Sequence, residues 1–341
     1  MPVDVHVHII PPVALRDKAP EDTWRPRVIW KNGQQVIEFK GRRLRSAVRP
    51  IADLGALLEQ QARVGVDRMV LSPWVPLLRY GLHPEEGLRW ARGINEAMAE
   101  MAQAHPNHIR SLGTVPLQDP TLAARELREI MKEPGLVGVE VATSVRGTFL
   151  GDARFRPFWE AAAETGALVF IHPTTEGFNL PLFEEFYLWN TVANPLETTI
   201  TAAHLILSGV LAEYPDLKVL LAHGGGALLC VSSRMDHGYH VQPLARGALE
   251  HPPSVYMRRL WVDTVVHSPH TLRTLVEWLG TSHIVLGSDY PFDMGLAEPV
   301  RALQAAGLSP HATRAILDDN ICRLLGPKGW PRQNTHGEEA T

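Results

Sequence analysis

The segment LAARELREIMKEPGLVGVEVAT, residues 122–143, contains one complete helix–strand unit. Apolar side chains recur at three- and four-residue spacing in residues 122–133, which predicts an amphipathic helix. Residues 136–143 are a nearly continuous apolar run, which is typical of a strand covered on both faces. The same order follows downstream, where FRPFWEAAAETG at 155–166 precedes ALVFIHP at 167–173. Repetition of this unit predicts a parallel sheet with helices packed against it.

Eight such apolar runs occur along the chain, and helical segments separate them from Ile51 onward. Eight units over about 280 residues match a (β/α)8 TIM-like barrel, whose usual size is about 250 residues plus insertions. A doubly wound open sheet is the alternative, but its first strand is usually followed by a glycine-rich turn, where this chain has HIIPP. The expected strands are residues 3–10, 67–72, 109–117, 136–143, 167–173, 217–225, 259–266 and 283–291.

Two stretches interrupt this alternation. Residues 11–50 form an insertion, which we expect over one barrel mouth, and RVIWKNGQQVIEF within it predicts a small β-hairpin around Asn32-Gly33. Residues 174–194 are expected to be a long aromatic loop after the fifth strand. We expect residues 1–330 to form a single domain and the polar tail 331–341 to be disordered.

The composition indicates an ordinary globular protein. Of its 341 residues, 45% are hydrophobic and 21% are charged, which is enough apolar material for a large core. The net charge of −4 comes with no basic block, so we expect no nucleic-acid partner. No apolar run approaches the roughly 18–20 residues of a membrane span, and no signal segment precedes the first strand. Two cysteines do not suggest a disulfide framework, so we expect a cytoplasmic protein that does not bind membranes.

Two histidines, His6 and His8, stand in the opening strand DVHVH. Because side chains alternate on a strand, both should share one face with Asp4, while valines occupy the other. A buried imidazole must form a hydrogen bond or bind a ligand, so the pair favours a metal site. The alternative is an exposed pair on an edge strand.

Polar residues also stand at the ends of most of the other predicted strands, where the active site of such a barrel lies. Individually, His172 could cap its strand and Asp289 could hold a turn. Together, several histidines and an aspartate converging from different strands predict a site for Zn²⁺ or a similar divalent ion. The residues concerned are His6, His8, Glu140, His172, His223, Asp263 and Asp289.

Four motifs resemble the amidohydrolase superfamily, and within it the decarboxylase branch. They are DVHVH at 4–8, FIHPT at 170–174, LAHGGG at 221–226 and LGSDYPFD at 286–293. The segment from Pro195 to His237 resembles that branch over its whole length, and the likeness extends from Val3 to about Gly295.

This resemblance implies a role for each matching residue. One divalent metal ion, most often zinc, would be held by His6, His8, His172 and Asp289, with His223 as the catalytic base. Two arginines would bind the substrate carboxylate, and one of them would reach the neighbouring site of a homodimer. Glu140 stands where the decarboxylases have a neutral residue, so it is a candidate for an additional metal or polar site. The implied substrate-binding residues are Arg45, Trp189 and Arg234, of which Arg234 is the one that reaches the neighbouring subunit.

The favoured function is non-oxidative decarboxylation of a small unsaturated or aromatic carboxylic acid, with His223 and Asp289 handling the proton. The alternative is metal-dependent hydrolysis or hydration, such as opening a lactone or an amide. Glu140 keeps this alternative open, because a fourth-strand carboxylate bridges two metals in other amidohydrolases. A metal-stabilised scaffold without activity is disfavoured by the base at His223 beside an open metal position.

Overall fold

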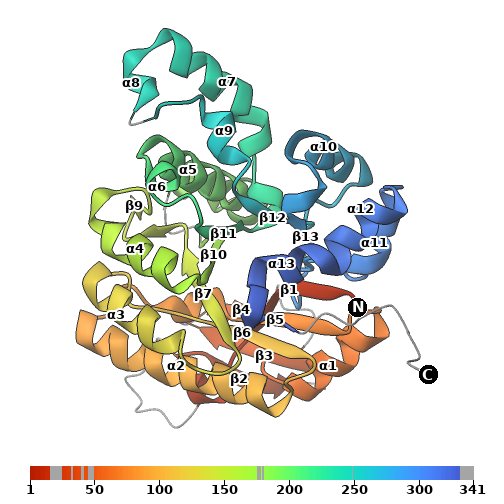
Figure 1. The fold of residues 1–341 in the computed structure, drawn as a ribbon. Helices are drawn as coiled ribbons and strands as arrows, with labels where there is room; N and C mark the ends of the chain where they lie inside the picture. The colour runs from red at the N-terminus through yellow and green to blue at the C-terminus, as the bar shows by residue number, and fades with distance from the viewer. Residues whose placement is uncertain are drawn as a thin grey trace, which may run out of the picture.

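The computed structural model describes residues 1–15, 25–31, 34–39, 42–44, 50–174, 178, 180–247 and 249–330. Eight parallel strands form one sheet at the centre of the molecule, and helices surround it (Figure 1). In sheet order the strands are β1 (Val3–Ile9), β5 (Arg68–Pro73), β6 (Ile109–Gly113), β7 (Leu136–Ala142), β10 (Leu168–His172), β11 (Lys218–Leu221), β12 (Trp261–Asp263) and β13 (Ile284–Val285).

The sheet closes between its first and last strands. The N–H of Val5 donates to the carbonyl of Leu286 at 2.9 Å, and the N–H of His8 donates to that of Tyr290 at 2.8 Å. In the opposite direction, the N–H of Asp289 donates to the carbonyl of His6 at 2.9 Å. These bonds join β1 to the chain that follows β13, so the predicted (β/α)8 barrel is confirmed.

Helices occupy the connections between successive barrel strands, as expected for a parallel sheet. The connection from β11 to β12 contains the helices α7, α8 and α9, of which α7 and α8 project from the barrel (Figure 1). The helices are α1 (Leu54–Arg63), α2 (Pro84–Ala104), α3 (Pro120–Ile130), α4 (Arg156–Thr165), α5 (Asn194–Leu207), α6 (Val210–Glu213), α7 (Leu228–Val241), α8 (Pro243–Arg246), α9 (Pro253–Met257), α10 (Pro269–Leu279), α11 (Pro299–Ala305), α12 (Pro310–Arg314) and α13 (Asn320–Leu325).

Buried apolar side chains form two layers. One lies between the strands and the surrounding helices, and the other fills the barrel, where Val5, Phe170 and Leu220 meet residues of α13 and Trp330. Arg68 and Arg110, from the starts of β5 and β6, place their guanidinium groups 5.3 and 4.9 Å from the ring of Trp330. Trp330, α13 and these two arginines therefore close the N-terminal end of the barrel.

The insertion contains a small antiparallel sheet, β2 (Arg27–Lys31), β3 (Gln34–Phe39) and β4 (Arg42–Leu44). The predicted hairpin is confirmed by β2 and β3, whereas β4 was not predicted; the turn at Asn32-Gly33 lies outside the described residues. Ile37 is buried in the layer between strands and helices, so the insertion is anchored to the barrel. The predicted disordered tail, residues 331–341, also lies outside the described residues.

Two connections differ from the expected loops. A two-stranded hairpin, β8 (Ser144–Val145) and β9 (Thr148–Phe149), follows β7 and was not predicted. The stretch 174–194 is not all loop, because it contains the 3₁₀ turn η4 (Pro181–Phe183) and the π-helical turn η5 (Trp189–Ala193) that leads into α5. Other single turns are η1 (Pro12–Leu15), η2 (Val75–Leu78), η3 (Ala153–Phe155), η6 (His223–Gly225), η7 (Thr281–His283), η8 (Ala315–Asp319) and η9 (Gly326–Lys328).

The prediction that Asp4 shares a face with His6 and His8 is wrong. Its Oδ2 accepts a 3.3 Å hydrogen bond from Gln61 of α1, so the carboxylate faces the helix layer. The pairing of β1 with β5 shifts in register between Asp4 and Val7, and this irregularity reverses the alternation of side chains. Both histidines consequently point into the barrel while Asp4 does not.

No helix within the described parts of the chain is both long enough and apolar enough to cross a membrane. Cys230 is exposed and Cys322 is partly buried, and no disulfide joins them.

Candidate active site and metal centre

The C-terminal ends of four barrel strands deliver a cluster of imidazoles and one carboxylate. His6 and His8 come from β1, His172 ends β10, His223 begins η6 after β11, and Asp289 follows β13. Ligand atoms of His6, His172, His223 and Asp289 all lie within 4.8 Å of one another.

His8 adjoins this group. Its Nε2 is 3.0 Å from Nε2 of His6 and 3.3 Å from Oδ1 of Asp289. The structure therefore brings together all five residues to which the sequence assigned the metal and the base.

The cluster fits a divalent cation. The ring Nδ1 of His172 donates to the carbonyl of Pro173 at 2.8 Å, which leaves a lone pair on Nε2. That Nε2 is buried and has no hydrogen-bond partner among the described residues. A buried polar atom without a partner is costly, and imidazole nitrogens together with a carboxylate are the donors that zinc and similar ions bind.

Electrostatics favour positive charge at the same place. Burial alone lowers the pKa of His6, but the carboxylates of Asp289 and Asp263 outweigh it and raise this pKa to about 10. Burial also lowers the pKa of His8 and, more strongly, that of His172, so both rings are neutral and able to donate lone pairs. Although burial opposes it, His6 and the other histidines hold the pKa of Asp289 well below its usual range.

Asp263, at the end of β12, positions two parts of the cluster at once. Its carboxylate accepts a 2.6 Å hydrogen bond from Nδ1 of His6 and bonds of 3.0 and 2.8 Å from the backbone N–H groups of His223 and Gly224. The turn also requires glycine, because a Cβ on Gly224 would lie 2.4 Å from the side chain of Val266. The sequence predicted only that Asp263 is a polar residue at the end of a strand, and it did not predict that Asp263 positions His6 and the turn at His223.

Replacing Asp263 with asparagine should lower metal affinity by about 10–100-fold, the usual effect of losing a partner that orients a ligating histidine. The amide preserves the shape but cannot accept all of the donors that face the carboxylate. Metal titration of the purified variant measures the effect, and Asp67→Asn, at an exposed carboxylate, is the matched control. Unchanged affinity in Asp263→Asn would contradict the positioning role.

Glu140 lies on β7 and is fully buried. Its Oε1 is 3.7 Å from Nδ1 of His8, on the side of that ring opposite to the clustered Nε2 atoms. Burial raises the pKa of Glu140 well above its usual range. The carboxyl group therefore stands behind His8, and its assignment to an additional metal or polar site stays a prediction.

A cavity of about 390 Å³ opens above the cluster. His172, His223 and Asp289 line its polar end, and aromatic and apolar side chains line its walls. The volume is near the lower end of the roughly 300–1,000 Å³ that small-molecule sites occupy. The described wall residues include Trp74, Val75, Leu78, Arg79, Tyr80, Trp189, Asn190, Asn194 and Phe292.

The three predicted substrate-binding residues fall in different places. Trp189 lines the cavity. Arg234 is exposed on the projecting helix α7 and is not among the described lining residues of its own chain's cavity. Arg45 lies outside the described residues. Sequence reasoning missed Arg79 and Asn194, for which neither a motif nor a spacing gave a signal.

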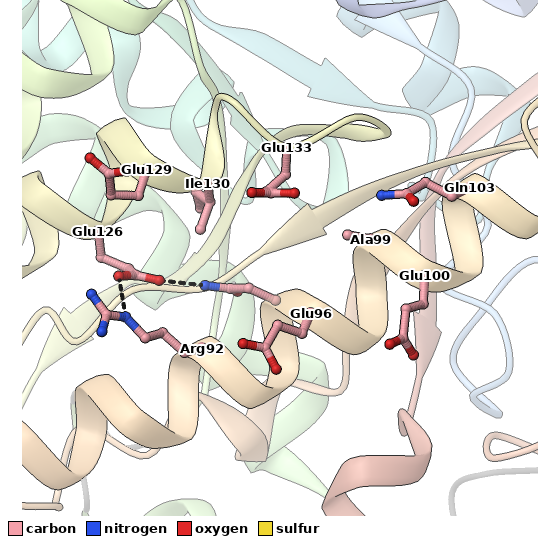
Figure 2. A pocket seen from close by; sticks show the side chains of 10 residues that line it. Arg92, Glu96, Ala99, Glu100, Gln103, Glu126, Glu129, Ile130 and Glu133 are labelled. Carbon is pink, nitrogen blue, oxygen red and sulfur yellow. Dashed lines mark hydrogen bonds and ion pairs between the residues drawn. The ribbon is translucent and has the colours of Figure 1, made fainter.

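A second hollow, of about 410 Å³, lies between α2 and α3 and is rich in glutamates (Figure 2). Two hydrogen bonds there join α2 to the chain after β6: Nδ2 of Asn95 donates to the carbonyl of Thr114 at 3.0 Å, and the N–H of Thr114 donates to Oδ1 of Asn95 at 2.7 Å. Glu126 accepts from Arg92 at 2.9 Å and from Asn95 at 3.4 Å (Figure 2). The side chain of Asn95 therefore holds the chain that follows β6 against α2.

Asn95→Ala should lower the free energy of unfolding by about 1–3 kcal/mol, because it leaves buried groups of Thr114 and Glu126 without their partner. Metal content should not change. Chemical denaturation measures the difference, and Gln103→Ala, at an exposed position on the same hollow, should cost much less. Equal losses in the two variants would contradict this account.

Known proteins resemble this chain over most of its length. The amidohydrolase family model matches residues 3–326. A 2-amino-3-carboxymuconate-6-semialdehyde decarboxylase from Dictyostelium discoideum is 29% identical over 329 residues, which cover 95% of this chain and 91% of the relative. A gamma-resorcylate decarboxylase from Rhodococcus jostii is 28% identical over 251 residues, which cover 67% of this chain and 74% of the relative.

A solved structure shows the same fold. It is a dihydroxybenzoic acid decarboxylase from Polaromonas sp. JS666 with bound manganese and the inhibitor 2-nitroresorcinol. Its TM-score is 0.77 at 23% identity, over 95% of this chain and 96% of that chain. Since the family model spans the barrel from β1 to α13, the predicted membership is confirmed, and the chain belongs to the amidohydrolase family.

Proposed function

We propose that the protein is a metal-dependent, non-oxidative decarboxylase of a small unsaturated or aromatic carboxylic acid. The observation that carries this proposal is the cluster of imidazoles and Asp289 at the polar end of an aromatic-walled cavity. The Dictyostelium relative, which matches 95% of the chain, decarboxylates an unsaturated acid by its name, and the Rhodococcus relative an aromatic one.

The proposed ligands are His6, His8, His172 and Asp289, and the proposed ion is Zn²⁺. Three imidazoles and one carboxylate suit zinc, although Mn²⁺ also accepts such donors and is bound in the Polaromonas structure. When bound, the ion would act as a Lewis acid on a substrate oxygen and would lower the pKa of a coordinated water. Elemental analysis should find about one ion per chain; two ions would favour the hydrolytic alternative with Glu140 as a bridge.

Side chains of this protein would transfer the proton and bind the substrate. The bond between the substrate carbon and its carboxylate breaks, CO₂ leaves, and the electron pair stays on the carbon, which must receive a proton. His223 lines the cavity, and its Nε2 is 3.4 Å from Oδ2 of Asp289, so this pair can hold and deliver that proton. Trp189 and Phe292 provide aromatic surface for a planar substrate and keep water away from it.

The test of the reaction is a panel of small acids, lactones and amides. Release of CO₂ with retention of the remaining ring or chain supports the proposal. Ring opening or amide cleavage without CO₂ would replace it with the hydrolase or hydratase alternative.

A further proposal concerns how two subunits complete the substrate site. Arg45 and Arg234 would bind the substrate carboxylate, with Arg234 reaching the site of the second subunit in a homodimer. The exposure of Arg234 on the projecting helix α7 supports this arrangement. Sedimentation should give the mass of two chains, and a fully active species with the mass of one chain would contradict it. We also propose a cytoplasmic location, on the basis of two cysteines that form no disulfide with each other.

A further inference from the structure

We infer that Glu197, a buried residue in the first turn of α5, positions the metal ligand His172 through the peptide group that joins Pro173 to Thr174. Glu197 is not among the described lining residues of the cavity, so its effect on the site must pass through other groups. This role rests on the proposed function, which makes His172 a ligand, but the hydrogen bonds that carry it can be followed without the ion.

The peptide group between Pro173 and Thr174 has a hydrogen bond at each end. Its carbonyl accepts the 2.8 Å bond from Nδ1 of His172, which leaves the Nε2 lone pair of that ring for the metal. Its N–H donates to Oε2 of Glu197 at 3.1 Å. Because the peptide is trans, its C=O and N–H point in opposite directions. One rigid plane therefore connects the carboxylate of Glu197 to the ring of His172.

A carboxylate at this place strengthens the bond to His172 as well as directing it. Negative charge beside a peptide N–H polarises the group, and hydrogen bonds in a buried chain strengthen one another. The Pro173 carbonyl thus becomes a better acceptor, and Nε2 of His172 becomes a more basic ligand, as happens when a carboxylate accepts directly from a ligating histidine. Asp263 accepts directly from His6 at 2.6 Å, whereas Glu197 acts through one peptide group.

The hydroxyl of Thr143, just after β7, fixes the carboxylate of Glu197. Its Oγ1 donates to the same Oε2 at 2.7 Å. The N–H of Thr143 donates to the carbonyl of His172 at 3.2 Å, and the carbonyl of Thr143 accepts a 2.7 Å bond from Oγ1 of Thr201 on α5. Two residues of α5 thus hold the ends of β7 and β10 together at the proposed ligand.

The burial of this network indicates a role beyond packing. Glu197, Thr143 and Thr201 have no exposed surface. An apolar side chain would fill the same space without the cost of burying a carboxylate, which must be hydrogen-bonded to be tolerated there. The N–H groups of the first helical turn reduce that cost for Glu197, because they favour negative charge.

The test is the variant Glu197→Gln, which keeps the shape and an oxygen acceptor but removes the charge. It should lower the affinity for Zn²⁺ by about 10-fold, the lower end of the range for partners that contact a ligating histidine directly. Glu197→Ala removes the acceptor of the Thr174 N–H as well and should lower the affinity further. Competition with a zinc chelator of known affinity measures both changes.

Glu126→Gln is the matched control. Glu126 is also a buried glutamate, 3% exposed, and it accepts hydrogen bonds from Arg92 and Asn95 (Figure 2). The hollow in which it lies shares none of its described lining residues with the cavity. Both glutamine variants should lower the free energy of unfolding, measured by chemical denaturation, but only Glu197→Gln should change the affinity for Zn²⁺.

NMR of the histidine rings separates positioning of His172 from a general loosening of the site. In protein with ¹⁵N-labelled histidines, the Nδ1–H of His172 should give a slowly exchanging signal, identified by its absence from His172→Ala. In Glu197→Gln this signal should shift upfield and exchange faster, with or without Zn²⁺, because its acceptor is weaker. The Nδ1–H signal of His6, which is bonded to Asp263, should stay in place.

Three results would overturn the role of Glu197. They are unchanged Zn²⁺ affinity in Glu197→Gln, an equal loss of affinity in Glu126→Gln, and a His172 signal that stays in place or moves only together with that of His6. If wild type bound no Zn²⁺ but the His172 signal still moved in Glu197→Gln, the proposed metal centre would fail, whereas the link from Glu197 to His172 would stand.

Discussion

Replacing His223 with asparagine should lower turnover by about 10²–10⁴-fold, the usual contribution of a general acid or base, while the protein keeps its metal. The side chain of His223 is 15% exposed toward the cavity, and its Nε2 lies 3.4 Å from Asp289. Asparagine fills similar space, but its amide does not exchange protons near neutral pH. The measurement is CO₂ release with the best acid of the panel, together with the metal content of the same sample.

His270→Asn is the control for this experiment, because His270 is an exposed imidazole on α10. It should retain full turnover. Loss of the metal in His223→Asn would show that His223 is a ligand, which its place among the clustered donor atoms makes a real alternative. Retention of both metal and turnover would exclude His223 as the base.

The architecture of the barrel was predictable because it follows from periodicity. Apolar runs such as 136–143 and helical patterns such as 122–133 repeat often enough that small errors at their ends do not change the fold. The same regularity placed His172, His223 and Asp289 at the ends of their strands, and a parallel barrel brings all such ends to one mouth. Predicting these side chains as neighbours required only the order of the elements.

Local irregularities were not predictable from alternation. Asp4 faces the helix layer because the pairing of β1 with β5 shifts, and its carboxylate there accepts a 3.0 Å hydrogen bond from the N–H of Ser288, which is far away in the sequence. The π-turn before α5 is a comparable case, since one additional residue in a helix leaves the apolar pattern almost unchanged. The first irregularity separates the direction of Asp4 from that of His6 and His8, and the second precedes Asn194, which lines the cavity.

The residues that contact the site residues could not be predicted from a single sequence either. Asp263 meets His6 across 257 positions, and Arg146 meets the chain after Arg79 from a hairpin of two-residue strands. Such contacts depend on side-chain positions within a few tenths of an ångström. The residues themselves carry no motif, so their roles emerged only from the structure.

Removal of the His172 imidazole should remove the metal and with it nearly all turnover. Its Nδ1 is already bound to the carbonyl of Pro173, so its lone pair at Nε2 has a fixed direction toward the cluster, and alanine offers no substitute. Metal affinity in His172→Ala should therefore fall by more than the roughly 10–100-fold expected for a residue that only orients a ligand, such as Asp263. Metal titration of the two variants beside His270→Ala tests this order. A protein that binds the ion equally well without His172 would overturn the ligand set, whereas a variant that regains turnover only at high metal concentration would locate the defect in binding rather than in the chemical step.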